Sequence, residues 1–173
     1  MHQIILYQNK MKTLIYILLF FPLVSLSQGI SLNVSQDARL ALVGDERGNE
    51  AFTTNVNLGF ELRGLQNGNS YFLMRPELEY ADLKGGELYR MTANFGYTFN
   101  KWVKNVDFTA TVGGGMLIRH ELSGLHTQAN LQTTWYFTKG VGLFLDSEFV
   151  QRRDLPNKFI GYSGKIGMKI ILK

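Results

Sequence analysis

The sequence of 173 residues contains no cysteine and three prolines. The absence of cysteine excludes disulfide bonds, a cysteine-ligated zinc site, a thiol nucleophile and a lipid-modified N-terminal cysteine. Charged residues make up 18% of the chain, which is below the roughly 25% of typical soluble domains. Lysine and arginine form no basic run, so the charge pattern does not indicate a nucleic-acid partner.

Glycine and aromatic residues are abundant instead. The chain has 18 glycines, 12 phenylalanines, 8 tyrosines and 2 tryptophans. Low charge combined with many aromatic residues argues against disorder. The length suits one domain, and the composition favours a β-rich one.

An apolar run near the N-terminus indicates export. Lys10 and Lys12 precede an apolar stretch over residues 14–26, and Ser25-Leu26-Ser27 provides the small residues of a cleavage site. The run is shorter than the ~20 residues of a membrane-spanning helix. We therefore predict a signal peptide over residues 1–27.

Within that segment, Met11 is an alternative start, because residues 1–10 add nothing to the signal. The remainder, residues 28–173, is predicted to be one β-barrel domain.

The dominant pattern after residue 28 alternates apolar and polar residues with a period of two, which is typical of β-strands. Turn signals separate the runs, and Asn67-Gly68 is a strong hairpin signal. The pattern predicts eight antiparallel strands and no helix longer than one turn. They cover residues 30–42, 52–63, 72–80, 89–99, 106–119, 128–137, 141–149 and 160–172.

Charged side chains within these runs occupy the polar phase alone. Seven are basic: Arg39, Arg63, Arg75, Arg90, Arg119, Lys165 and Lys169. Seven are acidic: Asp37, Glu61, Glu77, Glu79, Asp107, Asp146 and Glu148. A buried charge needs a partner, so this balance predicts that the fourteen groups pair with one another.

Alternation alone leaves two barrels open. A soluble exported lipocalin-like barrel places its apolar face inside around an apolar ligand, whereas a transmembrane barrel places that face toward lipid. The interior of eight strands is only just wide enough for its own side chains, and the apolar phase is too bulky to fit there. Glycines are also concentrated in the polar phase, where long charged side chains need room.

Aromatic residues near the ends of the runs support the transmembrane alternative, because membrane barrels carry aromatic belts at both interfaces. The predicted interface aromatics are Phe52, Tyr80, Tyr89, Tyr97, Phe99, Trp135, Phe137, Phe149 and Tyr162. The fold class predicted is therefore all-β, an eight-stranded antiparallel up-and-down transmembrane barrel.

With these features, residues 28–173 resemble the small eight-stranded outer-membrane barrels of the OmpX type and of the OmpA transmembrane domain. The resemblance implies an outer membrane of the Gram-negative kind, periplasmic N- and C-termini, and folding by the barrel-assembly machinery. It implies contact with outer-membrane lipid and lipopolysaccharide, and we expect a monomer. The chain departs from the family pattern by ending in Lys173 rather than in an aromatic residue.

Pro76 falls in the middle of the third run. Proline cannot donate to a β-ladder, so a bulge or a break is expected there. The short segments 44–51, 83–87, 120–126 and 152–158 are expected to be the loops on the outward side of the membrane.

One segment has an enzyme-like composition. Residues 119–126 contain histidine, serine and a carboxylate, the groups of a hydrolytic triad, and the candidate catalytic residues are His120, Ser123 and His126. Lipid A deacylases of the outer membrane, which carry such groups, are eight-stranded barrels. In a strand, however, residues three apart point to opposite faces, so His120 and Ser123 do not meet. We interpret 119–126 as an ordinary polar loop and predict no enzyme, cofactor or metal site.

The function predicted from the sequence is a structural or envelope role for a barrel with a charge-paired, plugged lumen. Eight strands leave little free interior, which favours a filled lumen over a channel. The alternatives are a narrow porin-like channel, a lipid A-modifying barrel enzyme and a soluble exported barrel binding an apolar ligand.

Overall fold

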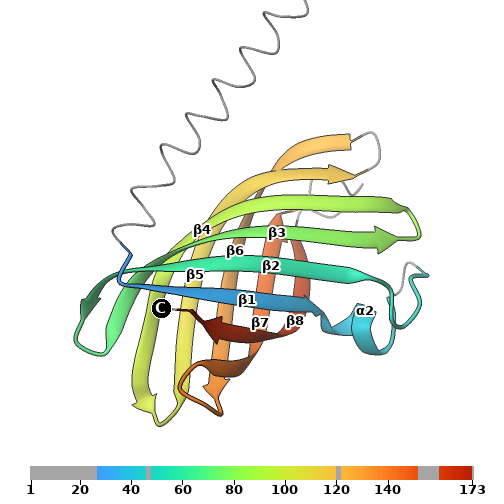
Figure 1. Ribbon diagram of the computed structural model, residues 1–173. Helices are drawn as coiled ribbons and strands as arrows, with labels where there is room; N and C mark the ends of the chain where they lie inside the picture. Colours follow the sequence, from blue (N-terminus) through green and yellow to red (C-terminus); the bar gives the residue numbers. More distant parts are fainter. Residues whose placement is uncertain (1–26, 46–47, 120–121, 152–159, 173) are drawn as a thin grey trace, which may run out of the picture.

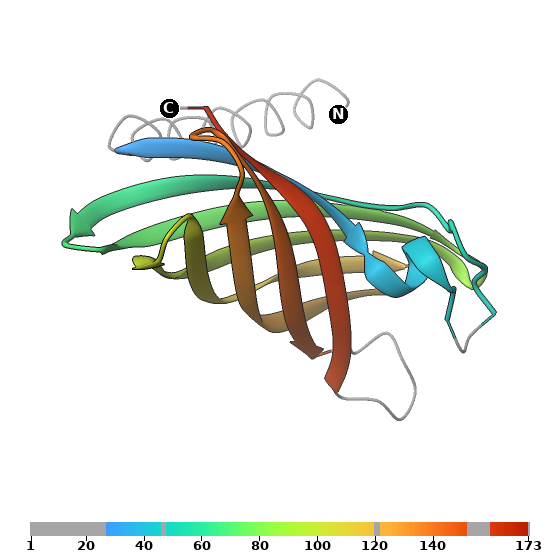
Figure 2. The ribbon, with the colours of Figure 1, turned by 90° about the horizontal axis from the view of Figure 1, so that it is seen from below.

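The computed structural model describes residues 27–45, 48–119, 122–151 and 160–172. Eight antiparallel strands form a closed barrel in which each strand pairs with its neighbours in sequence, and β8 pairs with β1 (Figures 1 and 2). The strands are β1 (Gly29–Asp37), β2 (Asn55–Asn67), β3 (Ser70–Leu83), β4 (Gly86–Val103), β5 (Val106–Arg119), β6 (Leu122–Tyr136), β7 (Val141–Gln151) and β8 (Ile160–Ile171).

This architecture confirms the predicted eight-stranded barrel. The predicted signal peptide, apart from Ser27, lies outside the described residues. Within the described ranges, no helix is long and apolar enough to span a membrane.

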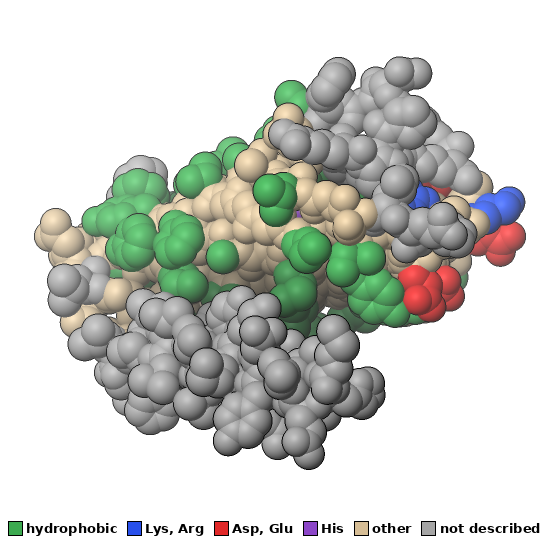
Figure 3. Space-filling view, turned by 90° about the horizontal axis from the view of Figure 1, so that it is seen from above, with side chains coloured by type: hydrophobic (Ala, Val, Ile, Leu, Met, Phe, Trp, Pro, Cys, Tyr) green, Lys and Arg blue, Asp and Glu red, His purple; other side chains and the backbone are tan. Residues whose placement is uncertain are grey.

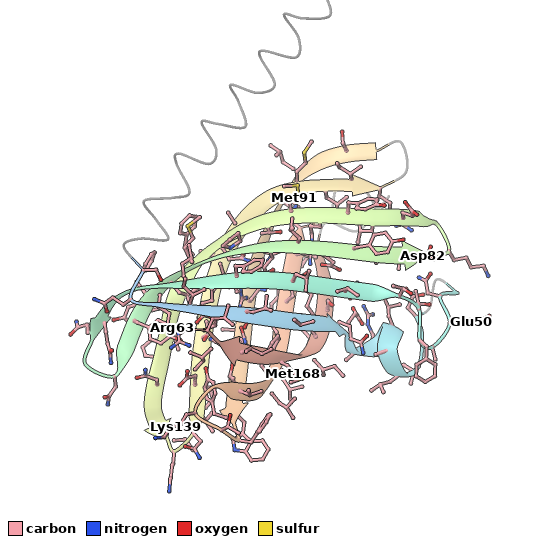
Figure 4. All side chains as sticks on the ribbon, viewed as in Figure 1. Glu50, Arg63, Asp82, Met91, Lys139 and Met168 are labelled. Carbon is pink, nitrogen blue, oxygen red and sulfur yellow. The ribbon has the colours of Figure 1, made fainter. Side chains whose placement is uncertain are left out.

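The barrel has two ends, which we name by what they carry. The α2 rim carries the end of β1, the short helix α2 (Ala38–Leu42) and the turn between β3 and β4. The terminal rim carries the start of β1, the end of β8 and the β6–β7 turn. Figure 4 shows Glu50 and Asp82 at the α2 rim and Lys139 at the opposite end.

The first predicted strand is wrong at its C-terminal end, because β1 stops at Asp37 and α2 follows. The Asp37 carboxylate accepts hydrogen bonds from the backbone N–H groups of Arg39 (2.8 Å) and Leu40 (3.3 Å). An aspartate in this N-cap position favours a helical turn over an extended chain. Leu40 is buried, so the apparent alternation over 38–42 belongs to a helical turn.

Pro76 lies within an unbroken β3, so the expected break is wrong. Strand β3 pairs with β4 in a single register from Ser70 to Leu83. The pairing of β3 with β2 has the same register on both sides of Pro76. The register shift along β2 falls between Arg63 and Gln66 instead.

The apolar phase faces outward along the strands, which overturns the alternative of a soluble barrel with an apolar interior. Leu131, Leu145 and Val112 leave 60%, 65% and 65% of their surface exposed. Residues of the polar phase, such as Asn94 and Thr134, are fully buried in the lumen. On the face shown in Figure 3, hydrophobic side chains spread over the strands and charged side chains lie at one end.

Two inward-facing glycines of β5 let it approach β4 closely. A Cβ at Gly113 would lie 2.2 Å from Asn94 Oδ1, and a Cβ at Gly115 would lie 1.8 Å from the carbonyl oxygen of Met91. Real side chains do not tolerate such distances. Gly113 and Gly115 therefore serve close packing of β4 and β5.

Candidate functional site: the charged lumen

Four ionised side chains form a closed network near the α2 rim, which we call the ion quartet: Glu79, Arg90, Glu148 and Lys165. Arg90 pairs with Glu79 and donates to Glu148 at 2.6 Å, and Lys165 Nζ lies 2.6 Å from Glu148 and 3.4 Å from Glu79. Asn55 donates a further hydrogen bond to Glu79 at 2.9 Å. Each charge therefore has two opposite partners, and the four formal charges cancel.

A second network is centred on Arg75, in the middle of the barrel. Arg75 leaves 1% of its surface exposed. Its guanidinium lies 2.6 Å from Glu77 and 3.5 Å from Asp146, and it donates to the side-chain oxygen of Gln132. Gln128 donates to Glu77 at 3.3 Å. These contacts join β3 to β6 and β7 across the lumen.

A third network lies toward the terminal rim around Glu61. Lys169 Nζ lies 2.7 Å from Glu61, and Arg63 Nε lies 3.4 Å from the same carboxylate. The hydroxyl of Tyr71 donates to Glu61 at 3.2 Å, and the guanidinium of Arg63 stacks 5.1 Å above the Tyr71 ring. Neither Glu61 nor Lys169 has any exposed surface.

The remaining predicted lumen charges differ in position. Asp37 is buried where it caps α2, and it accepts a hydrogen bond from Ser163. Arg39 lies on α2 at the mouth of the barrel rather than deep in the lumen. Its side chain is 57% exposed and pairs with Asp37 at 3.6 Å. Asp107 and Arg119 are half-buried at the two ends of β5.

The candidate catalytic residues do not form a common site. Ser123 is exposed on β6, whereas His126 is buried in the lumen with Nε2 2.9 Å from the hydroxyl of Thr92. His120 lies outside the described residues. The prediction of a loop up to residue 126 is wrong, because β6 already begins at Leu122. No cluster that could hold a metal ion occurs among the described residues.

The predicted interface aromatics lie near the two rims. Tyr80–Tyr89 and Phe149–Tyr162 form ring pairs near the α2 rim, with centroids 5.1 and 5.2 Å apart, and Tyr97–Phe99 forms one toward the terminal rim at 5.3 Å. Phe52 on the α2 rim is 86% exposed, and Trp135 and Phe137 toward the terminal rim are 57% and 51% exposed.

Sequence reasoning missed the uncharged partners of the networks. Gln132, Asn130 and Asn55 are each buried, and all three hydrogen-bond to charged groups. Their signal was present, since each occupies the polar phase of its run. The period-two pattern assigns them to the lumen, but it does not identify their partners.

Comparison with known proteins assigns this chain to a family. A family model described as "Domain of unknown function (DUF2715)" matches residues 8–152. The chain belongs to this family. No curated protein matches the sequence significantly.

Solved structures also resemble the barrel. The outer membrane protein Ail of Yersinia pestis, in a phospholipid nanodisc, matches with a TM-score of 0.56 and 11% identity over 83% of this chain and 99% of Ail. A de novo designed transmembrane β-barrel matches with a TM-score of 0.50 and 8% identity over 83% of this chain and 93% of the design. The fold of this DUF2715 member is thus that of small transmembrane β-barrels.

Proposed function

We propose that this DUF2715 protein is an integral outer-membrane β-barrel with a structural role in the envelope, and that ion pairs close its lumen. The apolar exterior and the aromatic belts support insertion in a bilayer. The cancelling charges of the ion quartet and the burial of Arg75 support a closed lumen.

The observation that carries this proposal is that ion pairs cross the lumen between strands that are not neighbours. Arg75 on β3 reaches Asp146 on β7, and Lys165 on β8 reaches Glu79 on β3. Between Arg75 and Asp146 lies a cavity of about 10 Å³, which is room for about one water molecule. Such a packed interior supports a lumen without a continuous aqueous path.

Single-channel recording in planar bilayers tests the closed lumen. We expect the wild-type protein to produce no discrete conductance steps under conditions where a porin reconstituted in parallel conducts. The triple variant Arg75→Ala, Glu77→Gln, Asp146→Ala removes the crossing pair and also neutralises the other carboxylate that contacts Arg75, and we expect it to admit ions. Discrete steps from the wild-type protein would contradict the proposal and favour the narrow-channel alternative.

We also propose that the protein has no catalytic centre. Supporting this, the side chain of Ser123 is exposed outside the barrel whereas that of His126 is buried inside it. Mass spectra of lipid A from cells with and without the gene test this point, and identical spectra are expected. A change in acylation that is lost in both Ser123→Ala and His126→Ala would establish an enzyme instead.

In a barrel with an even number of strands both termini lie on one side, and we propose that this is the periplasmic side. The α2 rim would then face lipopolysaccharide. We further propose folding by the barrel-assembly machinery and a monomeric barrel without a cofactor.

A further inference from the structure

The lumen changes character between the ion quartet and the α2 rim. On β3, the next inward-facing residue after Glu79 is Ala81. On β4, the inward-facing residue before Arg90 is Leu88. On β7, Glu148 is followed in the same way by the buried Val150. We name these inward apolar residues the apolar collar: Leu40, Ala81, Leu83, Leu88, Leu117 and Val150.

The apolar collar borders a cavity of about 330 Å³. Its floor is formed by Glu79, Arg90 and Glu148 of the ion quartet, and polar side chains such as Asn55 and Ser163 also line it. The volume is at the small end of the range for ligand sites, and the mouth of a β-barrel is a common place for such sites. Figure 4 shows the rim around this end of the barrel, where Glu50 and Asp82 lie.

The charges around the cavity select the class of ligand. Among the described residues, four acidic side chains and three basic ones line it. Lys165 of the ion quartet pairs with Glu79 and Glu148 at the floor, so the formal charges of these described groups balance. The acidic groups are Asp37, Asp45, Glu79 and Glu148, and the basic ones are Arg39, Arg90 and Arg119. A ligand with a net charge would lose its hydration on binding, and the cavity would offer it no unpaired opposite charge in return.

We propose that this cavity binds a small uncharged amphiphile, with its aliphatic part against the apolar collar and a hydroxyl-type head among the polar groups. Leu88 and Leu117 are each 4% exposed and pack with Ala81 and Leu83. They form a close-packed apolar wall of the cavity, and an aliphatic chain gains van der Waals contact along it. The site lies above the ion quartet, so its occupancy is independent of whether the lumen conducts.

Methyl NMR of the full mature chain in phospholipid nanodiscs tests the proposal, with 1-octanol as the probe. We expect saturable shifts of the Leu88 and Leu117 methyl groups. Leu73, fully buried in the lumen away from the cavity, should not shift. Leu131 faces outward and should report only the linear partitioning of octanol into the bilayer.

Two charged analogues of the same length, octanoate and octylammonium, should bind about tenfold more weakly or worse, given the desolvation penalty of a buried charge. Equal or tighter binding of either analogue would overturn the assignment of an uncharged ligand. Absence of a saturable shift with octanol would overturn the site itself.

Filling the cavity supplies the matched control. Leu117→Trp should abolish the saturable shift at Leu88, whereas Leu131→Trp on the exterior should preserve it. Ala81→Leu is a milder filling variant, which should weaken octanol binding if the larger substitution prevents folding. Gel mobility before and after boiling verifies that each variant is folded. Saturable binding that survives both filling variants would contradict the proposal.

Discussion

At the residue scale, the lumen is stabilised by charged side chains that are buried from water and contact one another. Arg90 is 5% exposed and contacts both Glu79 and Glu148. Removing Arg90 leaves two buried carboxylates with a single cation, Lys165, which is far more unfavourable than losing an exposed ion pair. The same residue type therefore has different importance at Arg90 and at Arg39.

Replacing Arg90 by alanine is expected to destabilise the barrel by roughly 3–5 kcal/mol, because the buried Glu79 and Glu148 then have only Lys165 to share between them. Urea unfolding in lipid vesicles measures the difference. Arg39→Ala is the matched control, since Arg39 is mostly exposed and pairs at 3.6 Å, and its effect should remain below about 1 kcal/mol. Equal effects of the two substitutions would contradict the role assigned to the ion quartet.

Gly115→Ala should also destabilise the barrel, by roughly 1–3 kcal/mol, because its Cβ would meet the Met91 carbonyl oxygen at 1.8 Å. Gly164→Ala is the control, because a Cβ at Gly164 meets nothing within 4 Å. The same unfolding experiment separates the two variants. A neutral Gly115→Ala would show that β4 and β5 separate at no cost.

At the scale of single elements, the strands present an apolar outer surface that suits contact with lipid. Leu145 in the middle of β7 and Leu42 on α2 have the same exposed fraction, 65%. They differ in place, because Leu42 lies beyond the strands at the α2 rim. Exposure alone does not distinguish a lipid-facing residue from a water-facing one, but a charge introduced at each position does.

Leu145→Arg is therefore expected to destabilise the protein in vesicles by roughly 2–4 kcal/mol, the penalty for a cation near the midplane of the bilayer. Leu42→Arg should change stability by less than about 1 kcal/mol. Unfolding titrations of both variants in the same vesicles provide the comparison. A reversed order would place the membrane boundary elsewhere.

The elements also show what sequence reasoning can and cannot reach. Period-two alternation predicts the strands and their two faces because side chains on a strand alternate. It fails over 38–42, where Asp37 caps a helical turn that mimics alternation. Partners such as Arg75 and Asp146 lie 71 positions apart, and their contact follows from strand register and barrel closure rather than from local pattern.

At the scale of the whole molecule, the absence of cysteine from the sequence makes topology measurable. Lys84 in the β3–β4 turn and Lys139 in the β6–β7 turn are both exposed and lie at opposite rims. In intact cells, a membrane-impermeant maleimide should label Lys84→Cys and leave Lys139→Cys unlabelled. Labelling of Lys139→Cys alone would invert the proposed orientation.

The whole molecule is a membrane barrel with its apolar face toward lipid. The gel mobility of the protein from the outer-membrane fraction, compared with and without boiling, tests this directly. We predict a faster-migrating unboiled band that shifts to the unfolded position on boiling. A protein that stays soluble without detergent, with no difference in mobility, would contradict the account.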